Sequence, residues 1–201
     1  MDKLKNIMNR NKKIIFFLII LLVVALISGS LFCIILNDVD KQLVIESIAK
    51  FLENIKKPDY ITTLKQGLIN NSIYITVIWL LGFSIIGIPI ILFSFFLKVF
   101  VLGFSIANFI SIYGLKGIVY SLAYIFPHHI LNIINYIFLS IVTLKVSFSL
   151  MYAIFKKKKI DFKPIMNHYF IYLAIGLGMM LVSTLLEVYL MPLLMRLLVG
   201  N

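Results

Sequence analysis

The stretch from Ser72 to Tyr113 constrains the fold more than any other part of the chain. It holds 42 residues and a single charged side chain, Lys98. An α-helix rises about 1.5 Å per residue, so roughly 20 apolar residues cross the ~30 Å hydrocarbon core of a bilayer. The stretch is therefore long enough for two membrane spans joined by a tight turn. We place these spans at 73–93 and 99–113, with Lys98 at a turn on the cytoplasmic side.

The composition agrees with a protein that crosses the membrane several times. The chain has 201 residues, of which 62% are hydrophobic and 13% charged, and its mean hydropathy is +1.06. A net charge of +11 would suggest nucleic acid in a soluble domain. Beside apolar spans, anionic headgroups and the positive-inside rule explain it better. We therefore expect the lipid bilayer, and no nucleic acid, as a partner.

Three further spans are expected outside this stretch. Residues 14–36 carry no charge, and five basic residues precede them, which places the N-terminus in the cytoplasm. The fold class that follows is an all-α, polytopic bundle of about five transmembrane helices in a single domain, with the C-terminus outside. The expected remaining elements are a half-helix at 118–126, a fourth span at 128–155 and a fifth at 168–190.

Residues 37–71 form the only sizeable polar segment, and we place it outside the cell. It contains five basic and five acidic residues. Val44, Ile48, Phe51 and Ile55 recur at helical spacing, so a short amphipathic helix is expected. We expect it to end at 57–59 and a second helical piece to follow. The segment is either a connector on the outer membrane surface or a docking surface for an extracytoplasmic partner.

Small residues in the paired spans indicate where helices approach each other closely. Gly82 and Gly87 lie in the second expected span, and Gly103 and Ala107 lie in the third. Pro89 lacks the N–H of a helical hydrogen bond, so a kink is expected there.

A break is expected near Pro127, within 27 uncharged residues at 118–144. His128 follows the proline. Non-helical backbone is tolerated at membrane depth where protein buries it. Asn132 and Asn135 are expected to form hydrogen bonds between helices.

Glu187 is the only carboxylate within an expected span. We place it near the outer end of the last span, either paired with the region of Lys116 or solvated at the interface.

No catalytic, metal or cofactor site emerges from the residues. A metalloprotease helix carries His-Glu-x-x-His, whereas His128-His129 has neither a following Glu nor a third ligand nearby. Transport requires polar groups along a path through the membrane. Glu187 and a few Asn give that alternative limited support, so a permease or transporter subunit remains a second reading beside a non-enzymatic role.

Several motifs together resemble one family. The run from Trp79 to Gly103 (Trp-Leu-Leu-Gly-Phe-Ser-Ile-Ile-Gly-Ile-Pro, then Phe-Leu-Lys and Gly-Phe), Phe126-Pro127, and the ending 186–192 (Leu-Glu-Val-Tyr-Leu-Met-Pro) resemble stage II sporulation protein M. The resemblance covers roughly residues 14–200. The wider superfamily often has Pro-His-Gly-x-x-Glu at the break. In this chain His129 and Asn132 replace the Gly and the Glu, which fits a structural role.

The resemblance implies a non-enzymatic scaffold in endospore formation. Members of this family act at the sporulation septum and the mother-cell membrane. They work with the sporulation stage II proteins D and P, two peptidoglycan-degrading partners that thin the septal wall during engulfment. For this chain the resemblance therefore implies those two partners, while a homo-oligomer stays open.

Overall fold

The computed structural model describes residues 2–56, 58–125, 128–156 and 162–199, and their ordered elements are all helices. In chain order they are α1 Asp2–Ile35, α2 Asp38–Lys56, α3 Tyr60–Leu81, α4 Gly87–Tyr113, α5 Leu115–Ile125, α6 His128–Lys156, α7 Phe162–Leu185, the π-helical turn η1 Leu186–Leu190, and α8 Met191–Val199. The all-α fold expected from the sequence is confirmed.

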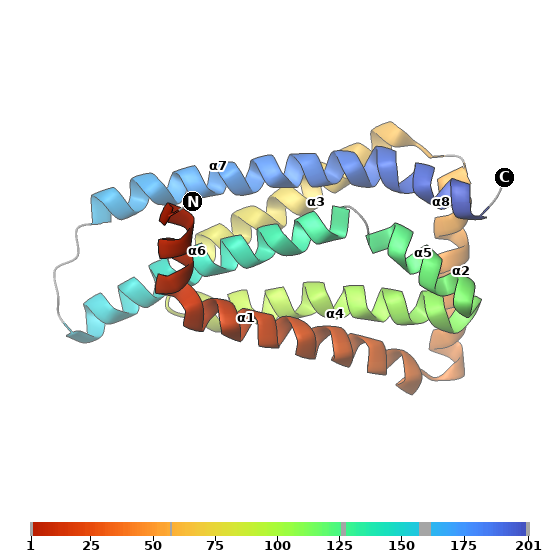
Figure 1. Cartoon of the computed structure of the whole chain (residues 1–201), viewed down its shortest axis with the longest axis horizontal. Helices are drawn as coiled ribbons and strands as arrows, with labels where there is room; N and C mark the ends of the chain where they lie inside the picture. Colours follow the sequence, from red (N-terminus) through yellow and green to blue (C-terminus); the bar gives the residue numbers. More distant parts are fainter. Residues whose placement is uncertain (1, 57, 126–127, 157–161, 200–201) are drawn as a thin grey trace.

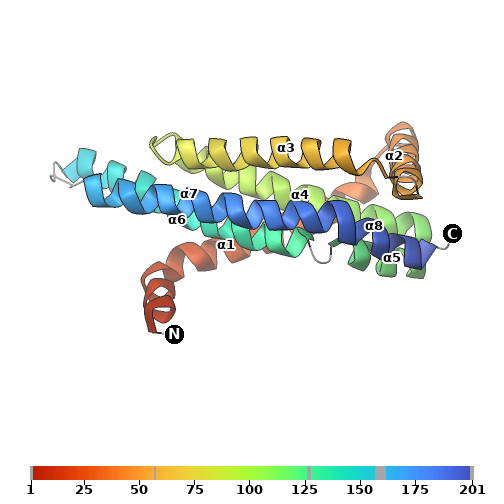
Figure 2. The same ribbon diagram turned by 90° about the horizontal axis from the view of Figure 1, so that it is seen from above.

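The long helices run roughly along one axis, and α2 lies across their ends (Figures 1 and 2). The end of α1, the start of α3, the end of α4 and α8 gather beside α2, and we call this the α2 end. The α3–α4 turn lies toward the opposite end, where α6 gives way to α7. We call that the turn end. The first turns of α1 lie toward the turn end and bend away from the bundle, whereas α8 lies at the α2 end (Figures 1 and 2).

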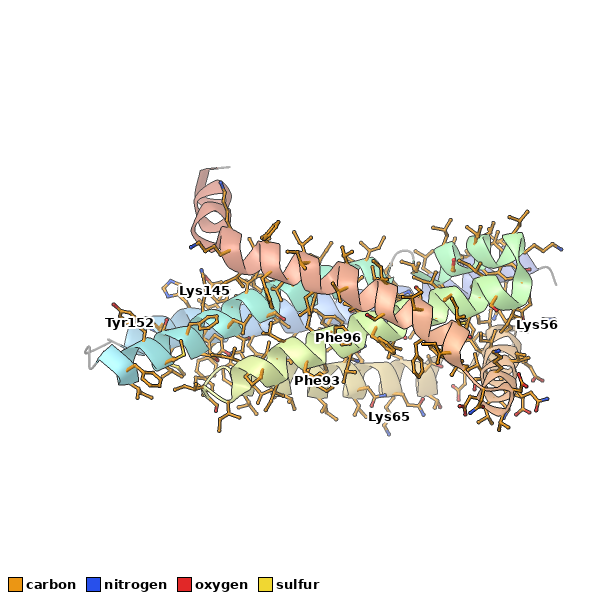
Figure 3. The ribbon with its side chains drawn as sticks, turned by 90° about the horizontal axis from the view of Figure 1, so that it is seen from below. Lys56, Lys65, Phe93, Phe96, Lys145 and Tyr152 are labelled. Atoms are coloured by element: carbon orange, nitrogen blue, oxygen red, sulfur yellow. The ribbon has the colours of Figure 1, made fainter. Side chains whose placement is uncertain are left out.

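Four helical segments in the described part of the chain are long and apolar enough to cross a membrane. They are Lys12–Ile35, Gly87–Tyr113, His128–Phe155 and Ile165–Leu198, and the shorter α5 is also apolar. Large apolar side chains such as Phe93 are exposed on the outside of the bundle (Figure 3), where lipid would cover them. The 22 residues of α3 have sufficient length, but Lys65, Asn70 and Asn71 make its first twelve residues more polar.

The expected position of the helical hairpin is wrong. We placed helices at 73–93 and 99–113 with Lys98 at the turn, whereas α3 ends at Leu81 and α4 begins at Gly87. Lys98 lies in the interior of α4. The turn consists of Gly82–Ile86 and is closed by short-range bonds, including Gly82 N–H to Trp79 O (3.1 Å) and Gly87 N–H to Ser84 O (3.2 Å).

The residue types at this turn explain the correction. Gly82 and Gly87 bracket it, and glycine disfavours a helix interior. A Cβ at Gly87 would collide with the Leu81 carbonyl across the turn, so Gly87 permits the tight reversal rather than the packing of two helices. Pro89 is the third residue of α4. An N–H group at this position would have no acceptor within the helix. Pro89 therefore breaks no helical hydrogen bond, and the kink we expected from it is not required.

The polar segment at 37–71 also differs from expectation. Its first part forms the amphipathic helix α2, but residues 60–71 belong to α3 and are not a separate piece on the surface. Asp59 caps α3 by accepting a hydrogen bond from the Thr62 N–H at 3.2 Å. A hydrogen bond with the Thr62 side chain, together with this bond from the Thr62 backbone, lowers the pKa of the exposed Asp59 carboxyl. A capped start continuous with apolar turns favours one helix over two.

Glycines allow α1 and α4 to approach each other closely. A Cβ at Gly103 would meet the carbonyl of Leu26, and a Cβ at Gly29 would meet the carbonyl of Phe100. Ser30 adds a hydrogen bond from its Oγ to the Gly103 carbonyl at 3.2 Å. The expected packing position at Gly103 thus faces α1, and Gly29 supplies the matching position. Ala107 lies half-buried one turn farther along α4.

An aromatic pair joins α3 to α7 near the turn end. The Trp79 and Tyr169 rings stack with centroids 5.1 Å apart. Trp79 Nε1–H donates to the Tyr169 carbonyl at 3.2 Å, and Tyr169 O–H donates to the Trp79 carbonyl at 2.6 Å. A Cβ at Gly82 would collide with the Tyr169 hydroxyl. Gly82 therefore makes room for this pair, although it lies in a turn and not in the span where we expected it.

The first prediction concerns the contact between α1 and α4. Gly103→Ala should lower stability by about 1–3 kcal/mol because its new methyl group meets backbone rather than a movable side chain. Gly103→Leu should reduce the protein in the membrane fraction further. Gly178→Ala in α7 is the matched control, since its Cβ would meet no atom within 4 Å. The melting temperatures of the purified wild-type protein and its variants are measured by thermal unfolding and compared. Equal melting temperatures for Gly103→Ala and Gly178→Ala would contradict the packing argument.

The second prediction concerns orientation. The five basic residues in the first turns of α1, between Lys3 and Lys13, predict that the turn end faces the cytoplasm and α2 faces outside. In a Cys33→Ala background, a cysteine at exposed Glu53 in α2 should react with a membrane-impermeant maleimide in intact cells, whereas one at exposed Ile86 in the α3–α4 turn should react only after lysis. The reverse pattern would invert the topology.

Candidate functional site

The chain re-enters the bundle between α4 and α6. Gly114 has a φ of 57° and ends α4, after which α5 turns back toward the middle of the bundle (Figure 1). A Cβ at Gly117 would collide with the Phe109 carbonyl, so α5 lies directly against α4. The expected half-helix at 118–126 corresponds to α5, Leu115–Ile125. Pro127, the expected cause of the break, lies outside the described residues.

His128 begins α6 in the interior of the protein, with 1% of its surface exposed. Its carbonyl accepts a hydrogen bond from Ser183 Oγ of α7 at 2.9 Å. About two turns farther along α6, Asn135 Nδ2 donates to the Gly176 carbonyl at 2.9 Å. The hydrogen bond expected between helices is confirmed for Asn135. These two bonds hold the start of α6 against α7.

A cavity of about 450 Å³ lies beside this break. We call it the central cavity. It combines polar and charged side chains from α3, α4, α5, α6 and η1 with a few apolar ones. Its lining residues are Asn71, Tyr74, Ser94, Leu97, Lys98, Val101, Leu102, Tyr124, His129, Asn132, Tyr136 and Glu187.

Both charged residues of the central cavity belong to helical segments that are apolar enough to cross a membrane. Lys98 Nζ lies over the Tyr74 ring, 4.7 Å from its centroid. Such a cation–π contact stabilises an ammonium away from bulk water. Glu187 and Lys98 also interact electrostatically across the cavity.

Glu187 is positioned by an irregular turn. It lies in η1, where the Met191 N–H bonds to the Leu186 carbonyl five residues back instead of four. Pro192 follows and has no N–H to donate to the carbonyl four residues earlier. A wide turn at this point is a π-bulge, and such bulges are frequent at functional sites. It continues the α7 rod into α8 while redirecting the Glu187 side chain.

Two expectations about charged residues are therefore corrected. Glu187 was expected with Lys116 or at the interface, but it faces the central cavity with Lys98. Lys98 was expected at a turn, but it lies within α4. From the sequence we placed each of these charges at or near the end of a span. The polar cavity contributed by other helices accommodates both charges instead, and helix packing cannot be read from one segment alone.

The structure assigns Asn132 to the central cavity rather than to a contact between helices. It also adds Asn71, Tyr74, Tyr124 and Tyr136, which the sequence reasoning missed. Their spacing carried a signal. Asn132 and Tyr136 are four residues apart, as are Ser94 and Lys98, and residues four apart share one helix face.

The part of the chain that the structure describes contains no cluster of side chains that could hold a metal ion. No group of three or more His, Cys, Asp or Glu side chains gathers there. His128 and His129 are neighbours with ring centroids 4.2 Å apart, and their rings lie against Tyr124.

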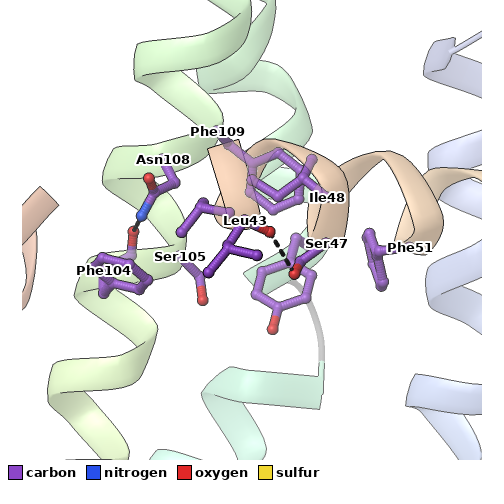
Figure 4. Close-up of a pocket in the computed structure, with 10 residues that line it drawn as sticks. Leu43, Ser47, Ile48, Phe51, Phe104, Ser105, Asn108 and Phe109 are labelled. Carbon is purple, nitrogen blue, oxygen red and sulfur yellow. Dashed lines mark hydrogen bonds between the residues drawn. The ribbon is translucent and has the colours of Figure 1, made fainter. Parts of the chain in front are cut away.

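A second concave site, which we call the α2 groove, lies between α2 and α4 (Figure 4). It has a volume of about 310 Å³ and is mostly apolar. Leu43, Ile48 and Phe51 of α2 face Phe104 and Phe109 of α4 across it. The remaining lining residues are Val44, Ser47, Ser105, Asn108 and Tyr124.

Contacts with both α4 and α8 hold α2 across the bundle. The Phe51 and Phe109 rings meet edge to face, 6.2 Å between centroids. Ile55 is buried, and its carbonyl accepts a hydrogen bond from Arg196 Nε at 2.6 Å. The opposite face of α2 carries Glu46, Lys50 and Glu53, all exposed. The helix thus presents an ordered polar surface at one end of the bundle.

Comparison with known proteins gives one result. The family model described as stage II sporulation protein M matches residues 4–192. No curated protein and no solved structure matches the chain. The match covers nearly the whole chain and includes the α3–α4 turn, the break, and Glu187. The chain therefore belongs to the stage II sporulation protein M family and is a multi-pass membrane protein related to sporulation.

Proposed function

We propose that the protein is a non-enzymatic membrane scaffold in endospore formation. In this proposal it sits in the mother-cell membrane at the sporulation septum. There it recruits the peptidoglycan-degrading sporulation stage II proteins D and P, so that the septal wall is thinned and engulfment can proceed. Family membership supports a role in sporulation. The scaffold role and its partners rest on the resemblance described above and on the surface formed by α2.

The observation that carries the proposal is the position of α2. An amphipathic helix beside a membrane span often lies free on the headgroups. Here the packing of Phe51 against Phe109 and the hydrogen bond from Arg196 fix it across the bundle. Glu46, Lys50 and Glu53 are spaced by four and three residues, so they form one stripe away from the bundle. A partner that met this stripe would bind a surface that is already ordered, which lowers the entropic cost of binding.

A specific observation also favours a second candidate, a permease or transporter subunit. Transporters commonly bind substrate near the bilayer midplane, beside discontinuous helices. The central cavity lies next to the α5–α6 break and contains two charged residues. Purification of the protein from sporulating cells separates the two candidates. Co-purified wall hydrolases support the scaffold, whereas a co-purified ATPase subunit supports the permease.

The third prediction tests the docking surface. Glu46→Ala, Lys50→Ala and Glu53→Ala together remove the polar stripe while Ile48, Phe51 and Ile55 keep α2 in place. Alanine preserves the helix. We expect normal amounts of the variant in the membrane, but loss of septal enrichment of the wall-degrading partners by fluorescence microscopy.

Lys65→Ala, at an exposed site on α3, is the control for loss of charge and should leave partner localisation unchanged. If the triple variant supports normal partner localisation and normal engulfment, α2 is only a connector, and the docking site must be sought within the membrane.

A further inference from the structure

The two charges of the central cavity lie well within apolar segments long enough to cross a membrane; the Lys98 side chain is exposed and Glu187 is half-buried. Lys98 is the twelfth of the 27 residues of α4, which places it about 16 Å along the axis from the first residue. Glu187 faces the same cavity from η1. Charged side chains at such depth are costly, and they persist where they line a polar path or bind a ligand. This cavity shares Tyr124 with the α2 groove but is otherwise lined by different residues, and it plays no part in the proposed scaffold role.

Lys98 and Glu187 do not satisfy each other directly. Among the described residues, no ion pair within 4.0 Å joins them, although each influences the other electrostatically. An ammonium has three donors and a carboxylate has about four acceptor sites. The ring of Tyr74 covers one side of the Lys98 ammonium and accepts no full hydrogen bond from it. Both charges therefore keep binding capacity that faces the cavity.

The neutral groups around these charges add further hydrogen-bonding capacity. His129 Nε2 is buried and has no hydrogen-bond partner among the described residues. Asn132 brings an amide, and Tyr124 and Tyr136 bring hydroxyls. A volume of about 450 Å³ lies within the range of sites for small ligands. Glu187 would repel a purely anionic ligand, and Lys98 would repel a purely cationic one. A ligand that carries both charges suits both residues.

The cavity opens toward the side of the bundle. Leu97 and Val101 on its rim are 43% and 57% exposed. From their turn, α3 and α4 diverge toward the α2 end (Figures 1 and 2), and residues of both helices line the cavity. In a bilayer this side faces lipid, so an amphiphile could place its headgroup inside while its chains remain outside.

We propose that the central cavity binds a small zwitterionic group, with its anionic part at Lys98 and its ammonium part at Glu187. Phosphoethanolamine has this chemistry. It reaches the cavity either as the headgroup of phosphatidylethanolamine through the side opening or as part of a small soluble molecule. The Tyr124 and Tyr136 rings line the same cavity, and aromatic faces suit a cation.

The fourth prediction tests this site by native mass spectrometry of the purified full-length protein. The probes are short-chain phosphatidylethanolamine, short-chain phosphatidylglycerol, which lacks the ammonium, and glycerophosphoethanolamine, which lacks the chains. We expect the wild-type protein to prefer phosphatidylethanolamine over phosphatidylglycerol. Lys98→Met and Glu187→Gln should each weaken that binding about ten- to hundred-fold, since each removes a charge-assisted contact. Lys98→Arg should retain most of it.

Matched controls separate the cavity from the rest of the surface. Lys65→Met on α3 and Glu53→Gln on α2 remove the same charge types at exposed sites and should bind as the wild type does. Melting temperatures measured without ligand show whether each variant is folded. If Lys98→Met proves destabilised, Lys98→Arg still tests the role of the positive charge, because it keeps that charge.

The outcomes are distinct. Binding of phosphatidylethanolamine but not of glycerophosphoethanolamine identifies a lipid as the source, and comparable binding of both identifies a soluble ligand. The proposal is overturned if phosphatidylglycerol binds as tightly as phosphatidylethanolamine, if folded Lys98→Met and Glu187→Gln bind as the wild type does, or if the wild type binds none of the probes.

Discussion

In the hydrocarbon core of a bilayer, every backbone N–H and C=O must find its partner within the protein, because no water is present to supply one. At the interruption between α5 and α6 the pairing within one helix is broken, and side chains link the start of α6 to its neighbour. Ser183 donates to the carbonyl of His128, and Asn135 donates to the carbonyl of Gly176. Both bonds join α6 to α7 and hold the start of the broken span against that helix.

The central cavity lies beside this break. The first turns of α6 line it with His129, Asn132 and Tyr136, and α5 contributes Tyr124. Side chains from α3, α4 and η1 converge there, and two of them, Lys98 and Glu187, are charged. The π-helical turn before Pro192 contributes by redirecting Glu187 without ending the rod of α7 and α8. The break, the cavity and the irregular turn therefore depend on one another.

At the other end of the molecule, α2 relates the bundle to its surroundings. Its apolar face is bound to α4 and α8, and its charged stripe is left for contacts outside the protein. The two proposals concern different parts of the molecule. The scaffold depends on a surface that the bundle holds in place, and zwitterion binding depends on the interior. Neither requires the other, so experiments on α2 and on Lys98 report on separate properties.

The sequence by itself determined that the chain is helical and embedded in a membrane, because long uncharged runs can bury their backbone only as helices. It also located the amphipathic helix after 37, the break near 127 and the family. It misplaced the hairpin turn, since Gly82, Gly87 and Pro89 suit either a packed, kinked helix or a turn. Only the tertiary structure decided that Gly103 meets α1 and that Lys98 and Glu187 share a cavity. The physical reason is that helical periodicity shows which residues share a face of one helix, whereas the partner of that face depends on how all the helices pack together.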